Sequence, residues 1–142
     1  KEKTKAQRLE EQGAAGGTET ILVGEDEDNL RKIAANFLQT LGYRVITARN
    51  GEEALALFHE VAGEIDMALL DVAMPGMNGF DVYHEIRKAR PDIAVLFMTG
   101  YSLDSANIST IRKQGISVIR KPFTMIALAR RIREILDREK TA

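Results

Sequence analysis

The first feature that suggests chemistry is a run of acidic side chains directly after a short apolar stretch. In "ILVGEDEDN", residues 21–24 precede four consecutive acids at residues 25–28. Like charges this close repel one another, so the run costs free energy unless a cation or a helix dipole offsets it. Three further polar residues, Asp71, Thr99 and Lys121, each stand at the end of another apolar stretch.

These residue types favour phosphoryl transfer at a divalent cation. If Glu25, Asp26 and Asp71 came together, they could not all stay charged without a cation. Mg²⁺ fits, because it usually binds through one or two carboxylates together with waters and phosphate oxygens. With the Lys121 ammonium and the Thr99 hydroxyl nearby, the site would hold a phosphoryl group. An aspartate there can act as a nucleophile and form an acyl phosphate, with the protein supplying positioning and charge neutralisation.

Each of these residues also has a purely structural interpretation. Acids at a helix N-terminus are stabilised by the helix dipole, by about 0.3–1 kcal/mol each, and we assign only that role to Glu27 and Asp28. Taken singly, Asp71 could be a solvated strand end, Thr99 could cap a helix and Lys121 could be a surface lysine. Their occurrence together at four strand ends favours the functional interpretation.

The elements that would position these residues alternate regularly along the chain. Short apolar runs predict strands at residues 20–24, 43–48, 66–71, 93–99 and 117–120. Amphipathic helices are predicted between them, including a weaker one over residues 102–114, and a last helix follows the fifth strand. Gly42 is predicted to end the first of these helices, and Asn50 and Thr124 to cap later ones. The predicted inward stripe of that first helix is Leu30, Ile33, Ala34, Phe37, Leu38 and Leu41.

This alternation predicts an α/β domain with a doubly wound five-stranded parallel sheet and helices on both faces. In such sheets ligands bind beyond the carboxyl ends of the strands, where the polar residues above would meet. Residues 1–19, polar and then glycine-rich, are predicted to be a flexible linker or tail. Residues 20–139 are predicted to be the folded domain.

Composition narrows the function classes. The chain has 142 residues, 29% of them charged, a net charge of -1 and no cysteine, which excludes disulfides, thiolate metal sites and thiol catalysis. The near-neutral charge argues against nucleic-acid binding, and an arginine cluster on the last helix is interpreted as a solvated face. No apolar run is long enough to span a membrane, no signal peptide is found, and we expect a cytoplasmic location. The four arginines are Arg130, Arg131, Arg133 and Arg138.

The chain resembles a response-regulator receiver domain, the phospho-acceptor module of two-component signalling. The resemblance covers about residues 20–138 and rests on "VGEDE", "LLDVAMPGMNG", "MTGY" and "RKPF", each at the end of a predicted strand. Each motif is weak alone, and their order makes the set specific. The resemblance implies the flavodoxin-like strand order 2-1-3-4-5.

The resemblance also implies a role for each site residue. Asp71 would be the phosphoryl acceptor, and Glu25 and Asp26 the acidic pair that binds Mg²⁺, with Mn²⁺ as the alternative ion. The backbone carbonyl of Ala73 would complete the metal ligands that the protein supplies. Thr99 would hydrogen-bond the phosphoryl group and Lys121 would pair with it. The peptide bond before Pro122 would be cis and would fix the aim of the lysine.

Two positions bear on switching and on the lifetime of the phosphorylated state. Relatives usually carry an aromatic ring where this chain has Val118, so a ring-based readout of phosphorylation is in doubt here. Tyr101 is our candidate for a partial substitute. Ala73 offers no side chain to orient water and Tyr101 could shield the acyl phosphate, so a long-lived phospho-aspartate is predicted.

The lead-in "GGTETILVGEDE" resembles the junction before a C-terminal receiver of hybrid sensor histidine kinases, a context that we favour over a stand-alone regulator. A membrane-bound sensor kinase could then carry this domain on its cytoplasmic side. The donor would be a phosphohistidine on a kinase or phosphotransfer domain, docking at the first helix and the rim loops, without direct membrane contact by this domain. A weak dimer is left open.

Two questions stay open at this point: whether the domain counts as an enzyme, and whether it is phosphorylated at all. Such a domain catalyses its own aspartate phosphorylation and dephosphorylation, so it is a reactant as much as an enzyme, and this sequence contains no kinase domain. The alternative function is an unphosphorylated pseudo-receiver that acts only as a protein-interaction module. Nucleotide- or flavin-binding domains are disfavoured, because neither "GxxxxGK[ST]" nor "GxGxxG" follows the first strand.

Overall fold

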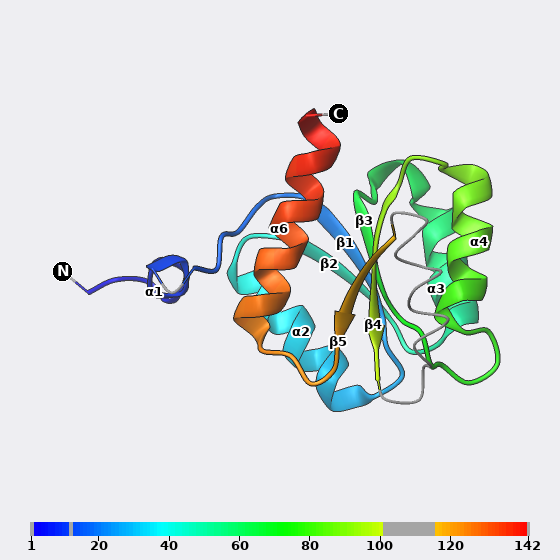
Figure 1. Ribbon diagram of the computed structural model, residues 1–142, viewed down its shortest axis with the longest axis horizontal. Coiled ribbons are helices and arrows are strands. Elements are labelled where there is room, and N and C mark those ends of the chain that lie inside the picture. Colours follow the sequence, from blue (N-terminus) through cyan, green and yellow to red (C-terminus); the bar gives the residue numbers. More distant parts are fainter. Residues whose placement is uncertain (1, 12, 101–115, 142) are drawn as a thin grey trace.

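The computed structural model describes residues 2–11, 13–100 and 116–141 (Figure 1). The helix predicted over residues 102–114 and the tuning residue Tyr101 therefore lie outside the described residues. The helices and strands are α1 (Lys5–Glu11), β1 (Thr20–Gly24), α2 (Asp28–Thr40), β2 (Arg44–Ala48), α3 (Gly51–Glu60), the short 3-10 helix η1 (Ala62–Glu64), β3 (Met67–Asp71), α4 (Gly79–Ala89), β4 (Ala94–Thr99), β5 (Ser117–Arg120) and α6 (Met125–Thr141).

The strands form one parallel five-stranded sheet in the order β2-β1-β3-β4-β5, which confirms the predicted doubly wound fold. Helices α2 and α6 cover one face of the sheet, and α3 and α4 cover the other (Figure 1). The central strands β1, β3 and β4 are buried along their whole length. Alternate residues serve opposite cores: Ile21 and Val23 belong to the core under α2 and α6, and Leu22 to the core under α3 and α4.

Local signals end and begin the helices as predicted. Gly42 follows α2 with φ at +103°, a left-handed conformation that glycine adopts without steric cost. The Asn50 side chain caps α3 by accepting a hydrogen bond from the Glu53 amide, and the Thr124 hydroxyl accepts one from the Ala127 amide at the start of α6. Gly42 thus marks the turn between α2 and β2, and the two caps mark where the loops after β2 and β5 end.

The inward stripe predicted for the first helix is wrong at Ile33, whose exposed fraction is 54%. The buried face of α2 is centred on Ala34 and Leu38 and also includes Arg31 and Ala35. Since successive helical residues point about 100° apart, this rotation turns Ile33 toward solvent and Arg31 inward. The charged Arg31, for which no role is predicted, is therefore buried, whereas the apolar side chain of Ile33 lies on the surface.

The lead-in differs from the flexible tether that its composition predicts. Ala14 is fully buried and contributes to the core under α2 and α6, and the Gly17 amide donates a hydrogen bond to the Leu41 carbonyl at 3.2 Å. The boundaries 1–19 and 20–139 stay a prediction. Within the part of the chain that the structure describes, no helix combines the length and the apolar character needed to cross a bilayer.

Candidate functional site

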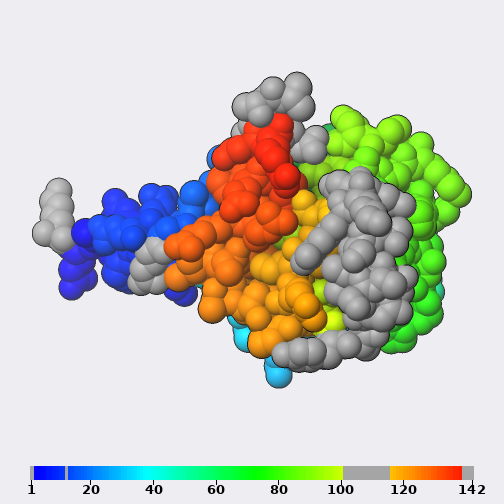
Figure 2. All heavy atoms as spheres, viewed as in Figure 1, coloured from blue at the N-terminus to red at the C-terminus, as the bar shows by residue number. Residues whose placement is uncertain are grey.

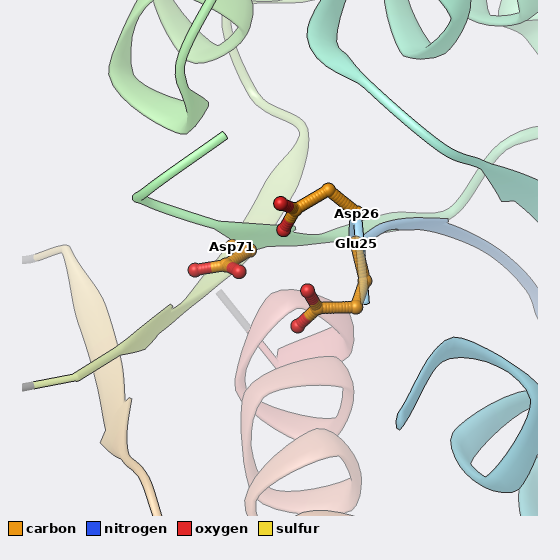
Figure 3. Close-up of side chains that lie close together, drawn as sticks. All are labelled: Glu25, Asp26 and Asp71. Carbon is orange, nitrogen blue, oxygen red and sulfur yellow. The ribbon is translucent and has the colours of Figure 1, made fainter. Parts of the chain in front are cut away.

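Three carboxyl groups meet at the edge of the sheet where the strands end. Glu25 and Asp26 directly follow β1, and Asp71 is the last residue of β3. Pairing of Gly24 with Leu70 places these two strand ends side by side. One oxygen from each carboxyl group lies within 4.8 Å of the others. Figure 3 shows the three side chains gathered at this edge. The predicted convergence of Glu25, Asp26 and Asp71 is therefore observed.

Burial distinguishes the three carboxyl groups. Glu25 and Asp71 are buried, whereas Asp26 is exposed. Burial is the largest cause of a rise in the Glu25 pKa from 4.5 to about 7. A hydrogen bond from the Glu27 amide opposes the rise, and the neighbouring Asp71 carboxylate adds to it. The site thus concentrates negative charge where solvent screens it poorly.

Lys121, which directly follows the outer strand β5, supplies a cation to this site at the same edge of the sheet. Its Nζ atom lies 2.9 Å from Oε1 of Glu25 and 3.0 Å from Oδ2 of Asp71. Burial lowers the Lys121 pKa, but the hydrogen bonds to the two carboxylates outweigh it and the pKa is raised overall. The Lys121–Pro122 peptide bond is cis. Lys121 therefore neutralises part of the charge that a metal ion would otherwise neutralise.

Thr99 contributes a buried hydroxyl to the same edge of the sheet. It ends β4, and its carbonyl accepts a hydrogen bond of 2.7 Å from the Lys121 amide. Its Oγ1 atom is buried and has no hydrogen-bond partner among the described residues. Leaving a buried hydroxyl unsatisfied costs about 1–3 kcal/mol. Such a cost at a strand end beside an acidic cluster is typical of a group whose partner is a ligand.

The loop after the acceptor strand folds back against its own beginning. The Ala73 amide donates a hydrogen bond of 3.1 Å to Oδ1 of Asp71, and the Gly79 amide donates one to the Val72 carbonyl. A Cβ atom on Gly79 would clash with the Asp71 carbonyl oxygen, so only glycine permits this approach. The Asp71 side chain is thereby held at the sheet edge: one carboxylate oxygen accepts a hydrogen bond from the Ala73 amide, and the other accepts one from Lys121.

Arg31 is a site-supporting residue that sequence reasoning missed. Its guanidinium is buried, donates a hydrogen bond of 3.0 Å to the Glu25 backbone carbonyl, and pairs with the Asp28 carboxylate at 2.5 Å. The hydrogen bond from Arg31 is the largest cause of the lowered Asp28 pKa. Asp28 thus does more than complement a helix dipole. The spacing of three residues between Asp28 and Arg31, typical of a helical ion pair, was the available signal.

The positions predicted to tune switching are less fully described. Val118 is half-buried in β5, opposite Phe97 of β4, and packs against the core under α3 and α4. The rings of Phe80 and Tyr83 contact Phe97, with centroid distances of 5.0 and 5.5 Å. Aromatic side chains therefore surround the β4 side of this pair, while β5 itself contributes only the valine.

The residues present fit a hard divalent cation. All three side chains of the cluster offer carboxylate oxygens, the donors that Mg²⁺ prefers, and the exposed Asp26 lies on the solvent side where waters could complete the coordination. Glu25, Asp26 and Asp71 would hold the ion. Such an ion, when bound, supplies positive charge that neutralises phosphoryl oxygens.

Fold and site together define an α/β domain with an acidic pocket, a lysine and a buried hydroxyl at the carboxyl ends of its strands. The chain belongs to the response regulator receiver domain family, whose model matches residues 21–133. This places it among the domains of two-component signalling. A solved response regulator receiver domain protein from Clostridium thermocellum is 33% identical, with a TM-score of 0.80 over 87% of this chain and 98% of that one.

Two curated relatives come from larger proteins. The sensor kinase CckA of Brucella abortus is 36% identical over 137 residues, which are 95% of this chain and 14% of that protein. The probable transcriptional regulator ycf27 of Cyanidium caldarium is 39% identical over 121 residues, 85% of this chain and 47% of that protein. The solved receiver domain of the hybrid histidine kinase CckA is 34% identical, with a TM-score of 0.69 over 82% of this chain and 98% of that one. The chain spans less than half the length of both curated relatives.

Proposed function

We propose that this chain is a phospho-acceptor receiver that takes a phosphoryl group from a phosphohistidine onto Asp71 and switches conformation in a phosphorelay. The observation that carries the proposal is the convergence of Asp71 with Glu25, Asp26 and Lys121. The Thr99 hydroxyl at the same edge has no hydrogen-bond partner among the described residues. A pseudo-receiver that serves only as an interaction module has no use for a complete acceptor, metal and lysine set. The pseudo-receiver function is the alternative that the experiment below tests.

In the proposed reaction a carboxylate oxygen of Asp71 attacks the phosphorus of the donor. An O–P bond forms as the N–P bond of phosphohistidine breaks, and the electron pair of that bond stays on the imidazole, which then takes a proton from solvent. Lys121, already within hydrogen-bond distance of Asp71, pairs with a phosphoryl oxygen, and Thr99 donates its hydroxyl to another. Hydrolysis of the acyl phosphate by water would later regenerate the carboxylate.

A surface beside the site suits a phosphohistidine-bearing partner. A groove of about 430 Å³ lies between the start of α2 and the loop after β5, and Lys121 is one of the residues that line it. Ile33, the large hydrophobic side chain that is exposed among the described residues, lies on its edge. An apolar edge next to the acceptor would let a helix of the donor dock and bring its imidazole to Asp71. The groove is lined by Glu27, Asn29, Leu30, Ile33, Lys121, Pro122 and Phe123.

We further propose that the chain is the receiver of a hybrid sensor histidine kinase. The support is the match to the Brucella sensor kinase, which covers 95% of this chain, and the similarity to a solved receiver from a hybrid histidine kinase. A cytoplasmic location follows from that context, because the donors of such receivers act there. A stand-alone regulator would use the same chemistry at Asp71.

The deciding experiment is uptake of beryllofluoride, an acyl-phosphate mimic, followed by backbone NMR. For the wild-type chain we expect Mg²⁺-dependent shifts centred on Glu25, Asp26, Asp71, Thr99 and Lys121. Asp71→Asn should abolish them. Asp92→Asn is the matched control, since it removes an exposed carboxylate at the opposite edge of the sheet. Absence of any Mg²⁺-dependent shift in the wild type would reject the acceptor function and favour the pseudo-receiver.

A further inference from the structure

The lead-in to the domain is held in place by more contacts than a tether needs. Ala14 is fully buried, and the Gly17 amide donates to the Leu41 carbonyl at the end of α2. From α6, Arg130 donates a hydrogen bond to the Gly13 carbonyl and Arg133 donates one to the Gly16 carbonyl, both at 3.2 Å. We call residues 13–19 the strap. Figure 2 shows the lead-in, in blue, against α6, in orange.

Arg133 joins the strap to two other parts of the fold. Its guanidinium contacts both carboxylate oxygens of Glu19, at 2.7 and 3.0 Å, in a bidentate pair. It also lies 3.3 Å from the Tyr43 hydroxyl and 3.0 Å from the Asp137 carboxylate. Side-chain exposure in the Arg133–Glu19 pair is only 16% and 10%. The prediction that this arginine belongs to a solvated face is therefore wrong, because it crosses from α6 to the strap.

The glycines of the strap serve close approach. A Cβ atom on Gly16 would clash with the Leu41 carbonyl oxygen, and one on Gly42 would lie 2.6 Å from the Gly17 carbonyl oxygen. Two backbone segments therefore touch where side chains would separate them. A segment free to move would not require glycine at such contacts, so the glycine-rich composition here reflects packing.

We propose that the surface formed by α6 and the α2–β2 turn is a built docking site for the strap, which fixes the orientation of the receiver relative to whatever precedes residue 13. The strap lies outside residues 21–133, the part that defines the family. The match to the Brucella sensor kinase covers 95% of the chain, and the unmatched 5% is too short to reach residue 13 from the N-terminus. The region aligned with this relative, of which the chain spans 14%, therefore includes the strap.

This arrangement couples the position of α6 to the position of the strap. A displacement of α6 would pull on the strap through Arg133, and a force on the strap would reach α6 by the same contact. The interface would therefore carry movement between the receiver and the preceding segment. It does so without depending on phosphorylation of Asp71, so its test is separate from the test of the acceptor site.

The experiment measures the distance between the strap and the domain by pulsed electron spin resonance. The chain contains no cysteine, so Ala15→Cys and Asn36→Cys, both at exposed positions, introduce two unique spin labels. We expect one narrow distance distribution for the otherwise wild-type chain. Gly16→Ala or Arg133→Gln should broaden it at least about twofold, toward the spread of a flexible linker.

Matched controls separate the docking site from general damage. Gly63→Ala makes the same chemical change where a Cβ atom meets nothing within 4 Å, and Arg131→Gln removes a neighbouring arginine of α6. Both should leave the distribution narrow. A cooperative thermal unfolding transition in every variant would show that the domain remains folded. A broad distribution in the wild type, or a narrow one in both Gly16→Ala and Arg133→Gln, would overturn the proposal.

Discussion

Lys121 and Asp71 are joined by a hydrogen bond of 3.0 Å between Nζ and Oδ2, although they lie 50 residues apart in the sequence. The same ammonium reaches Glu25 at 2.9 Å. Lys121 therefore neutralises part of the carboxylate charge that a divalent ion would also neutralise. An ion and the lysine would compete for the same carboxylates until a phosphoryl group offers the lysine another partner.

Replacing Lys121 by methionine should separate its competition with Mg²⁺ from its contact with the phosphoryl group. Mg²⁺ binding should become tighter, because the competing cation is gone. Uptake of beryllofluoride should weaken by at least about tenfold, since a hydrogen bond to a charged group contributes about 1.5–3 kcal/mol. Titration calorimetry measures the first effect and NMR titration the second. Lys88→Met, at an exposed pair with Glu85, is the control and should change neither. Weaker Mg²⁺ binding in Lys121→Met would contradict the competition.

The pKa of Glu25 predicts how stability depends on pH. Burial above all raises this pKa from 4.5 to about 7, so the folded chain holds the proton more tightly than the unfolded chain does. This contribution to stability is complete below pH 4.5 and is lost as the pH rises through about 7. Without divalent ions, the free energy of unfolding should fall on the order of 2 kcal/mol between about pH 5 and pH 8.

Thermal unfolding of the wild type and two variants checks this pH dependence. Glu25→Gln should flatten the profile, because the titrating group is gone, whereas Glu60→Gln, at an exposed position, should leave it unchanged. Added Mg²⁺ should stabilise the wild type more at high pH than at low pH, since the ion and the proton compete for the same carboxylate. Equal slopes in the wild type and Glu25→Gln would show that another group titrates.

The sheet and its functional edge could be predicted because parallel α/β topology leaves few choices. Buried strands read as unbroken apolar runs, and the carboxyl ends of parallel strands share one edge. Glu25, Asp71, Thr99 and Lys121 therefore converge once the strands are placed. The periodicity of α2 gave the spacing of its buried residues but not the rotation of the helix, so Ile33 and Arg31 were not placed correctly.

The strap could not be predicted from composition. Glycine-rich sequence is typical of flexible linkers and equally of close backbone contacts, and only the tertiary structure distinguishes the two. The contact of Gly16 with Leu41 and the pair of Glu19 with Arg133 join residues far apart in the sequence. No local pattern links them, so a segment expected to be free proved to be packed.

The buried hydroxyl of Thr99 predicts that its removal should raise stability and weaken binding of the phosphoryl mimic. Thr99→Val removes a buried polar atom that has no hydrogen-bond partner among the described residues, so the free energy of unfolding should rise by about 1 kcal/mol. Beryllofluoride binding should weaken, because the donor to its fluorine is lost. Denaturant unfolding and NMR titration measure the two effects. Thr40→Val is the control: its hydroxyl donates to the Asn36 carbonyl at 2.9 Å, so the change should not stabilise the chain.

Arg31 should control Mg²⁺ affinity without touching the ion. Its guanidinium holds the Glu25 carbonyl and the Asp28 carboxylate, so Arg31→Met should release the acidic loop and weaken Mg²⁺ binding by about tenfold, the usual cost of removing a residue that supports metal ligands. Lys32→Met removes an exposed positive charge from the adjacent position of α2. If charge alone mattered, both changes would strengthen binding, because each leaves the pocket more negative. Weaker binding in Arg31→Met together with unchanged or tighter binding in Lys32→Met, measured by calorimetry, would establish that Arg31 acts by positioning.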